Sequence, residues 1–300
     1  MATLITEQNG SRLYLTTLTH ILKHHRYRSP RELTTLDAGY VVLELNDPRY
    51  SLPVGTSRKL NINIAAAEAV QLIGGFARPD LLTRASVNFQ RYIEEDDGRF
   101  HGAYGSRITH QVSCAVNKLK RDPSSRQAVV TLWDPWLDNQ PGKKDYPCTV
   151  FLQFEVSPYD GRLEMNVVMR SNDAWLGLPY DLFQFAQLQL CVARALDLPP
   201  GRYRHTALSM HLYERDMAAA QQVVSQGLTS NIHFGLPEGF GRKGDCFQDI
   251  MRRARRTTTT GANEEETSDE RWYRDRFASY MGPDMDGGST DDREAEPVQS

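Results

Sequence analysis

The chain has 300 residues, 40% of them hydrophobic and 24% charged, which is enough to bury a sizeable core. Its formal net charge of -3 gives no overall positive field of the kind used to bind nucleic acid. The apolar runs are too short for a membrane span, and the N-terminus lacks a signal-peptide layout. The four cysteines form no CxxC pair or Cys/His cluster, which argues against structural zinc. We therefore expect a cytoplasmic protein with no membrane, nucleic-acid or metal partner.

Five stretches predict strands, and three of them alternate clearly between apolar and polar residues. They are residues 40–47, the apolar part of 122–136 that follows a polar turn, 149–157, 160–171 and 203–216. Between the third and fourth, "SPYDGR" contains the Pro, Asp and Gly typical of a hairpin turn. These two strands should therefore pair as an antiparallel hairpin.

Two stretches predict helices. Residues 58–75 begin with strand-like alternation and become helix-like, and Gly74-Gly75 is typical of a helix end. From Leu182 to Leu196, apolar residues recur at steps of three and four until "DLPPG" ends the pattern. With no βαβ repetition, G-x-G-x-x-G motif or P-loop, the sequence predicts an α+β fold with one mixed or antiparallel sheet packed with helices.

The composition changes after about Arg256. Beyond it the chain is polar, acidic and poor in apolar residues, so we expect one folded domain over 1–256 and an acidic, largely disordered extension over 257–300. Within that extension, "RWYRDRFASYM" is compatible with a short helix.

Cys148 follows Pro147 and opens a predicted strand. The simpler interpretation is a small buried apolar residue. The alternative is an exposed nucleophile, which requires nearby cations to lower the thiol pKa. Arg170 ends the next strand of the hairpin, so the fold could bring it close.

Three further groups allow both a structural and a functional interpretation. Arg170 to Asp173, before the turn residues Gly177 and Pro179, form either a solvated turn or an anion site. Glu68, in an apolar setting, is either a solvent-facing helix residue or an active-site carboxylate. His211 and Tyr213 lie on the same face of a predicted strand. They are either a polar pair at the edge of the sheet or residues that hydrogen-bond a sugar hydroxyl.

Taken together and in this order, these motifs resemble the thymidylate synthase superfamily from about Tyr27 to Asp216. The resemblance rests on "SPRE", "RKLNINIAAAEAVQLIGG", "AYGSR", "DPSSRQ", "PCTVFLQF", "MRSNDAWLGLPYD" and "SMHLYERD". It implies a mixed sheet packed with helices, in a homodimer that forms through the sheet. It also implies a pyrimidine nucleoside monophosphate and 5,10-methylenetetrahydrofolate as ligands, with no metal.

The resemblance also implies a role for each matched residue. Cys148 is implied as the nucleophile and Glu68 as the carboxylate that orients water and moves protons. The phosphate ligands implied are Arg31, Arg170, Ser171 and, from the neighbouring subunit, Arg126. Tyr104 corresponds to the family's Tyr-Gly element, Asp173 is implied on the base, and His211 and Tyr213 on the ribose.

Asp181 stands where thymidylate synthases have Asn. An Asn donates to uracil O4 and accepts from N3–H, whereas cytosine presents an N4–H donor and an N3 acceptor. A carboxylate accepts from N4–H and can share a proton with N3. In this respect, and in "RSND", the chain resembles the dCMP and CMP hydroxymethylases of the superfamily.

Other departures concern the phosphate site and the folate-facing end. Gln127 replaces the second arginine of the paired loop, Thr149 replaces the usual His beside the nucleophile, and Met169 replaces a polar residue. The family's C-terminal tail, which closes over folate, has no clear match.

The resemblance thus favours a cytidylate (CMP or dCMP) 5-hydroxymethyltransferase that uses methylenetetrahydrofolate and water. Two alternatives stay open: reductive C5-methylation, and a homologue that binds nucleotide or RNA without turnover. The sequence leaves ribose and deoxyribose open as well. A dCMP product would suggest phage DNA modification, and a CMP product nucleoside antibiotic biosynthesis.

Overall fold

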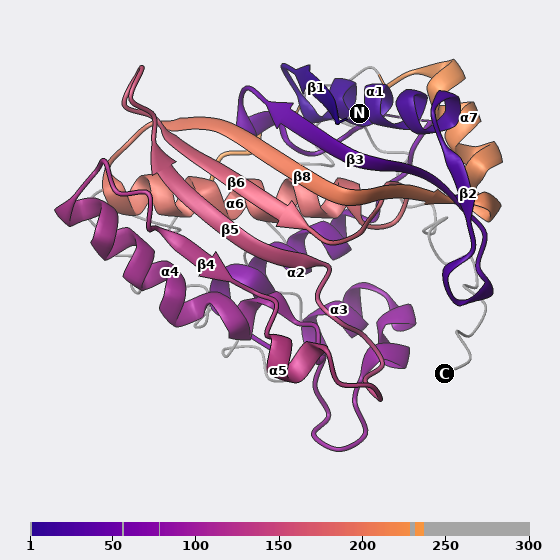
Figure 1. The fold of residues 1–300 in the computed structure, drawn as a ribbon, viewed down its shortest axis with the longest axis horizontal. Coiled ribbons are helices and arrows are strands. Elements are labelled where there is room, and N and C mark those ends of the chain that lie inside the picture. Colours follow the sequence, from indigo (N-terminus) through magenta and orange to yellow (C-terminus); the bar gives the residue numbers. More distant parts are fainter. Residues whose placement is uncertain (1, 56, 78, 229–231, 237–300) are drawn as a thin grey trace.

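The computed structural model describes residues 2–55, 57–77, 79–228 and 232–236. Its centre is a mixed sheet whose strands run in the order β1-β3-β8-β6-β5-β4, with β2 paired to β3 and β7 paired to β8 (Figure 1). The strands are β1 (Thr3–Glu7), β2 (Arg26–Arg28), β3 (Thr35–Leu45), β4 (Val129–Thr131), β5 (Thr149–Val156), β6 (Leu163–Met169), β7 (Asn172–Asp173) and β8 (Pro200–Tyr213). The pairs β1–β3, β6–β8 and β7–β8 are parallel, and the others are antiparallel.

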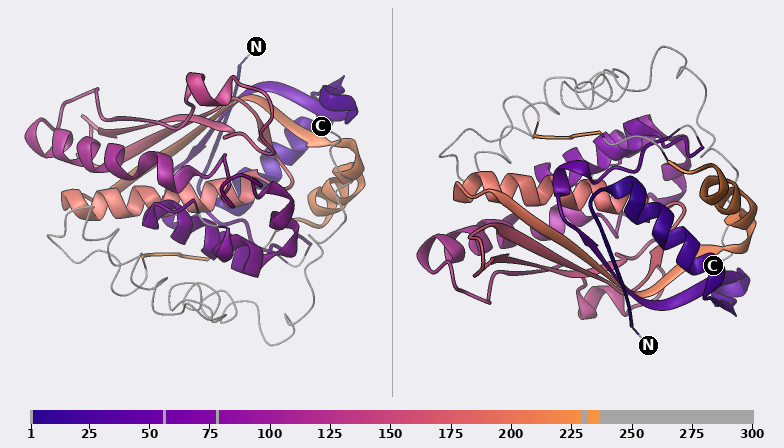
Figure 2. Two further views of the ribbon diagram at one scale, coloured as in Figure 1. Left: turned by 90° about the horizontal axis from the view of Figure 1, so that it is seen from below. Right: turned by 90° about the horizontal axis from the view of Figure 1, so that it is seen from above.

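The longer helices cover one face of this sheet. The helices of the described residues are α1 (Gly10–Lys23), α2 (Ile62–Gly74), α3 (Asp80–Ala85), α4 (Tyr104–Arg121), α5 (Pro135–Asp138), α6 (Leu178–Leu196) and α7 (Met217–Gln226). Figure 2 shows α1, α2, α4 and α6 on the same side of the strands. The predicted α+β fold with a mixed sheet packed with helices is therefore confirmed. Within the described ranges, no helix has the length and apolar character needed to cross a bilayer.

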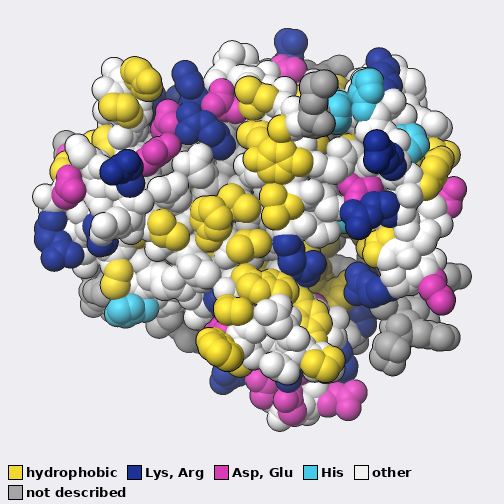
Figure 3. Space-filling model, viewed as in Figure 1, with side chains coloured by type: hydrophobic (Ala, Val, Ile, Leu, Met, Phe, Trp, Pro, Cys, Tyr) yellow, Lys and Arg dark blue, Asp and Glu magenta, His cyan; other side chains and the backbone are white. Residues whose placement is uncertain are grey.

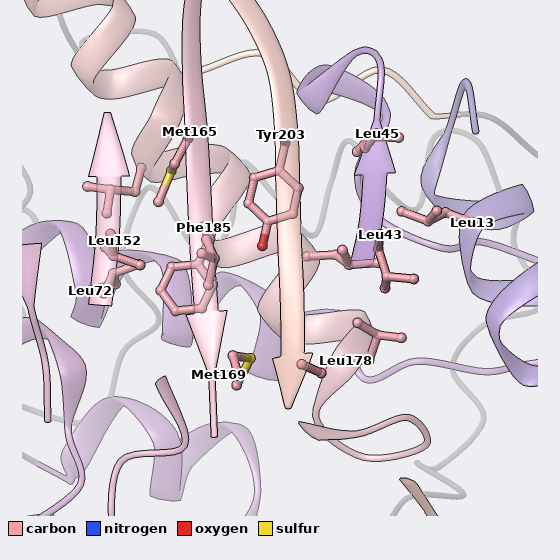
Figure 4. Close-up of a cluster of buried hydrophobic side chains, with 14 of the residues drawn as sticks. Leu13, Leu43, Leu45, Leu72, Leu152, Met165, Met169, Leu178, Phe185 and Tyr203 are labelled. Carbon is pink, nitrogen blue, oxygen red and sulfur yellow. The ribbon is translucent and has the colours of Figure 1, made fainter. Parts of the chain in front are cut away.

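The core lies between the sheet and α6. Nearly every side chain of α6 is buried, and Phe185 packs among Met165 of β6, Tyr203 of β8 and Leu72 of α2 (Figure 4). Each fully buried large apolar side chain contributes roughly 1.5–3 kcal/mol of transfer free energy. The core therefore fixes the first turn of α6 against the ends of β6 and β8, where the site is built.

The predicted hairpin is confirmed, with Phe154 of β5 opposite Met165 of β6. The strand-like start assigned to residues 58–75 is wrong. The helix begins at Ile62 because Asn61 caps it, its side chain accepting from the N–H of Asn63, and it ends at the left-handed Gly75. The boundary at 256, the acidic extension and its possible short helix lie outside the described residues.

The opposite face of the sheet, which we call the open sheet face, carries both charged and apolar side chains. Arg204 on β8 lies within 3.4 Å of carboxylates on β3, β5 and β6. Large apolar side chains exposed there include Leu4, Tyr40, Val129 and Leu208. Figure 3 shows apolar side chains gathered at the centre of this face. Such a mixture is typical of a surface that contacts another protein chain.

Candidate active site

A pocket of about 390 Å³ opens where the sheet meets the ends of α2, α4 and α6. Its volume is in the range of small-molecule sites. Six of the eleven residues predicted for the site line it: Arg31, Glu68, Tyr104, Cys148, Arg170 and Asp181. Residues up to 150 positions apart in the sequence therefore meet at one pocket.

The β5–β6 hairpin places Cys148 next to Arg170. The N–H of Arg170 donates to the Cys148 carbonyl at 2.9 Å, and an Arg170 Nη2–Sγ distance of 3.9 Å brings the guanidinium to the thiol. Arg170 is held there by its Nε, which donates to the Pro147 carbonyl at 3.0 Å, and by the ring of Trp133 at 5.2 Å. The proximity predicted from the hairpin is confirmed.

The pKa of the Cys148 thiol, however, is raised and not lowered in this structure. Burial raises the pKa of Cys148 to about 11, although the positive charge of Arg170 lowers it. Burial prevails because the thiolate would leave water for a site that also feels the carboxyl groups of Asp181, Asp145 and Asp173. Arg170 thus acts in the predicted direction, but the predicted net lowering of the Cys148 pKa is not found in this arrangement.

Glu68 faces the pocket from α2. Its Oε2 accepts a hydrogen bond of 3.3 Å from Gln184 Nε2 on α6. Burial raises the pKa of Glu68 well above its usual value, and the negative charge of Asp181 adds to this effect. A carboxyl group with a raised pKa is better suited than an ordinary one to donate and accept protons during a reaction.

Asp181 lies in the first turn of α6 and is only 6% exposed. Its Oδ2 accepts from Asn172 Nδ2 at 2.8 Å, and its Oδ1 accepts from Gln184 Nε2 at 3.1 Å. Burial raises the pKa of Asp181 to about 7, against the lowering effect of these two hydrogen bonds. The carboxyl group is therefore balanced between its two protonation states near neutral pH.

Tyr104 begins α4 beside the pocket. Its ring stacks on Phe185 with a centroid distance of 5.7 Å, and burial raises its pKa well above the usual value. The next residue, Gly105, packs on α2 so closely that a side chain there would meet the Gln71 carbonyl. This close approach lets the N-terminus of α4 reach the pocket wall.

Arg31 reaches the pocket from the loop between β2 and β3. Its backbone is left-handed, with φ of 51°, and that of Glu32 is too, with φ of 63°. Burial raises the pKa of Tyr213, and the positive charge of Arg31 opposes this effect. Arg31 in the pocket lining and Tyr213 outside it are thus neighbours.

Five predicted residues are outside the pocket lining: Arg126, Ser171, Asp173, His211 and Tyr213. Asp173 and His211 are paired across β7 and β8, and the rings of His211 and Tyr213 are in edge contact at 5.4 Å. Asp173 Oδ1 accepts from the N–H groups of Trp175 and Leu176. Arg126 precedes β4, and its carbonyl accepts from Gln153. The roles of these five residues stay predictions.

Sequence reasoning missed several residues at the site. Gln184 contacts both Glu68 and Asp181, and its position three residues after Asp181 on a helix is the signal that could have found it. Asn172 contacts Asp181 from β7, and the sequence shows it only as one letter of the "RSND" motif. Asp145, whose Oδ1 accepts from the Gly102 N–H, also lines the pocket.

The other end of the pocket has a different character. Phe89, Tyr92 and Phe100 supply aromatic surface, and Lys143 and Lys144 supply positive charge. The lysines also pair with Asp96 and Glu95 at 3.1 and 3.2 Å. An elongated ligand with an aromatic ring and an acidic tail fits such a lining.

A thiol beside a guanidinium, with two buried carboxyl groups across the pocket, is an arrangement typical of enzymes that use nucleophilic catalysis. The family model described as "Thymidylate synthase" matches residues 12–237. The chain belongs to the thymidylate synthase family, whose members bind a pyrimidine nucleotide and methylenetetrahydrofolate and are typically dimeric. The protein is accordingly a one-carbon transferase that acts at C5 of a pyrimidine. The described residues include no group of three His, Cys, Asp or Glu side chains placed to hold a metal ion.

Proposed function

We propose that the protein is a cytidylate 5-hydroxymethyltransferase, which converts CMP or dCMP, methylenetetrahydrofolate and water into the 5-hydroxymethyl nucleotide and tetrahydrofolate. The observation that carries the proposal is Asp181, a buried carboxyl group at the pocket that already accepts hydrogen bonds from two amides. The catalytic residues proposed are Cys148, Glu68 and Asp181.

The choice of cytosine follows from hydrogen-bond polarity. Cytosine N4–H donates to a carboxylate, and N3 can share a proton with it, so both contacts become favourable. Uracil O4 only accepts, and it would face an oxygen of the carboxylate. A buried mismatch of this kind costs roughly 1–3 kcal/mol, which is about 10- to 100-fold in binding.

The first chemical step proposed is addition of the Cys148 thiolate to C6 of the pyrimidine, which makes C5 a carbon nucleophile. Because the pKa of Cys148 is about 11, the thiol needs a base or a more electrophilic ring at the moment of attack. A proton shared between Asp181 and N3 makes C6 more electrophilic. The proton leaving Sγ can pass to a carboxylate of the pocket.

The folate supplies one carbon at the oxidation level of formaldehyde, and the aromatic and lysine-bearing end of the pocket suits its ring and its glutamate tail. Transfer of this carbon to C5 and breakage of its bond to the folate nitrogen release tetrahydrofolate, and loss of the C5 proton leaves an exocyclic methylene group on the ring, which is still bound to Cys148 through C6. Addition of water to the methylene group, followed by departure of the Cys148 thiolate from C6, gives the hydroxymethyl product and the free enzyme without any net oxidation or reduction. Glu68, whose pKa burial raises well above its usual value, is the group proposed to orient that water and move protons.

The phosphate is proposed to bind at the Arg31 and Arg170 side of the pocket, with Ser171 beside them. Asp173 is proposed to contact the base, and His211 and Tyr213 the sugar. Residues 1–256 are proposed as the catalytic domain.

The test is to incubate the purified full chain with tetrahydrofolate, formaldehyde and CMP, dCMP, UMP or dUMP separately, and to measure product masses. We expect a gain of one CH₂O unit on a cytosine nucleotide, and the better sugar identifies the substrate. A gain of CH₂ with dihydrofolate release would instead identify reductive methylation. Absence of any product, with normal nucleotide binding by Cys148→Ala, would favour a binding protein without turnover.

We further propose a homodimer through the open sheet face, with Arg126 completing the phosphate site of the neighbouring subunit. Two facts support this: Arg126 is outside the lining of its own pocket, and exposed apolar side chains gather on that face. Arg126→Ala and Cys148→Ser should each be inactive alone. Mixed after reversible dissociation, they should regain up to about a quarter of wild-type activity, since only one kind of site in the mixed dimers is intact. No recovery, despite mixed dimers detected by mass spectrometry, would place Arg126 in its own subunit's site or outside the sites.

A further inference from the structure

Asp181 is the first member of a buried hydrogen-bond chain that leads away from the pocket. Asn172 Nδ2 contacts Asp181 Oδ2 at 2.8 Å, and Asn172 Oδ1 contacts His205 Nε2 at 2.9 Å. His205 Nδ1 contacts the Tyr203 hydroxyl, also at 2.9 Å. Asn172 is 2% exposed, and His205 and Tyr203 are fully buried. The chain runs from the first turn of α6 through β7 into β8.

The chemistry of these groups fixes the direction of every hydrogen bond when Asp181 is ionised. A carboxylate only accepts, so the Asn172 amide N–H must point to it and the Asn172 carbonyl must point to His205. His205 then has to carry its proton on Nε2. Burial lowers the pKa of His205 to about 3, so the ring is neutral and has only that one proton. Its Nδ1 is therefore an acceptor, and Tyr203 must donate to it.

The same chain disfavours a proton on Asp181 Oδ2. Such a proton would need an acceptor, and the Asn172 carbonyl could serve only if the amide turned over, His205 moved its proton to Nδ1 and the Tyr203 hydroxyl changed from donor to acceptor. Gln184 holds Oδ1 in a similar way from the α6 side. Two amides thus stabilise the ionised form, in opposition to burial.

From this geometry, and resting on the proposed function, we infer that Asn172, His205 and Tyr203 are positioning residues for the cytosine edge. They hold the Asp181 carboxyl group as an acceptor on both oxygens, so that the proton it shares with cytosine moves towards ring N3. This is a proton transfer from Asp181 to N3 and involves no oxidation or reduction. The ring gains positive charge, so C6 becomes more electrophilic.

Other charged groups also act on Asp181. Asp173 on β7 raises its pKa, and Asp181 in turn interacts with Glu68 of α2, Tyr104 of α4, Cys148 before β5 and Tyr203 of β8. A variant that tests the chain must therefore leave these charges unchanged. His205→Phe and Tyr203→Phe meet this requirement, because His205 is neutral and burial keeps the Tyr203 hydroxyl protonated.

The experiment measures Asp181 directly in the ligand-free protein. Chains labelled with ¹³C at the Asp carboxyl carbon are titrated by NMR, and Asp181→Asn assigns the resonance. We expect His205→Phe to raise the midpoint by about one pH unit, because Asn172 loses the partner that orients it. Tyr203→Phe should raise the Asp181 midpoint by less, because Asn172 keeps its contact with His205 and only the preference of His205 for the Nε2–H tautomer is lost. Tyr180→Phe, which removes a hydroxyl that accepts from the Asn61 N–H, is the matched control and should not move it.

An activity readout complements the titration. His205→Phe should lower kcat for the cytosine nucleotide by roughly tenfold with a smaller change in KM, and His205→Gln, which restores an N–H donor, should recover part of it. An unchanged Asp181 midpoint in His205→Phe would overturn the inference, and if that variant does not fold, the same outcome in Tyr203→Phe would do so. If wild type makes no cytosine product, the proposed function fails, while the titration still decides whether the chain controls Asp181.

Discussion

Cys148→Ser should lower turnover by roughly four orders of magnitude or more and leave nucleotide affinity within about tenfold of wild type. A serine hydroxyl is a far weaker nucleophile than a thiol, and even Arg170 at 3.9 Å from the sulfur does not bring the thiol pKa down in this buried place. Product mass measures turnover, and calorimetry measures nucleotide binding. Exchange of the C5 hydrogen of CMP into D₂O reports the addition at C6 separately.

Cys114→Ser is the matched control, because Cys114 is exposed on α4 with its sulfur 3.6 Å from His110 Nδ1. It should keep full activity. Turnover or C5 exchange in Cys148→Ser at more than about a hundredth of the wild-type rate would remove Cys148 as the nucleophile.

Asp181→Asn should reverse the choice of base, with the cytosine-to-uracil ratio of kcat/KM falling by roughly 100-fold or more. A neutral amide cannot share a proton with N3, so the cytosine ring loses its activation. Uracil gains a partner that both donates and accepts. Parallel kinetics with CMP and UMP, or with dCMP and dUMP, measure the ratio.

Gln184 will shape the outcome of this substitution. In the variant, one amide N–H of residue 181 points to where Gln184 Nε2 now donates, so the Gln184 amide has to turn over. Its carbonyl then faces Glu68, whose raised pKa lets a protonated carboxyl donate to it. The exposed Asp160→Asn is the control for loss of one negative charge. An unchanged base preference in Asp181→Asn would show that Asp181 does not read the cytosine edge.

The central strands and the helices α2 and α6 could be predicted from local patterns because their signals are strong. Alternation identified β3, β5 and β6, and helical spacing identified α6. The strand β1 and the helices α1 and α4 were not predicted. The parallel contact of β6 with β8 depends on a crossover through α6, which sequence spacing alone does not reveal.

At the site, too, contacts within one hairpin could be predicted, whereas contacts between strands distant in the sequence could not. The meeting of Cys148 and Arg170 follows from one hairpin and was predicted. The chain from Asp181 to Tyr203 was not, because Asn172 and His205 are 33 residues apart and meet only through parallel strands. The direction of the Cys148 pKa was also missed, since burial depends on every element around the thiol.

The loop that carries Arg31 has a consequence for protein engineering. Left-handed backbone costs a residue other than glycine roughly 1–2 kcal/mol, and both Arg31 and Glu32 adopt it. Selection for thermal stability alone should therefore favour glycine or asparagine at these two positions. At position 31, however, the stabilising substitution would also remove a guanidinium group from the pocket. Greater thermal stability would therefore come with weaker substrate binding.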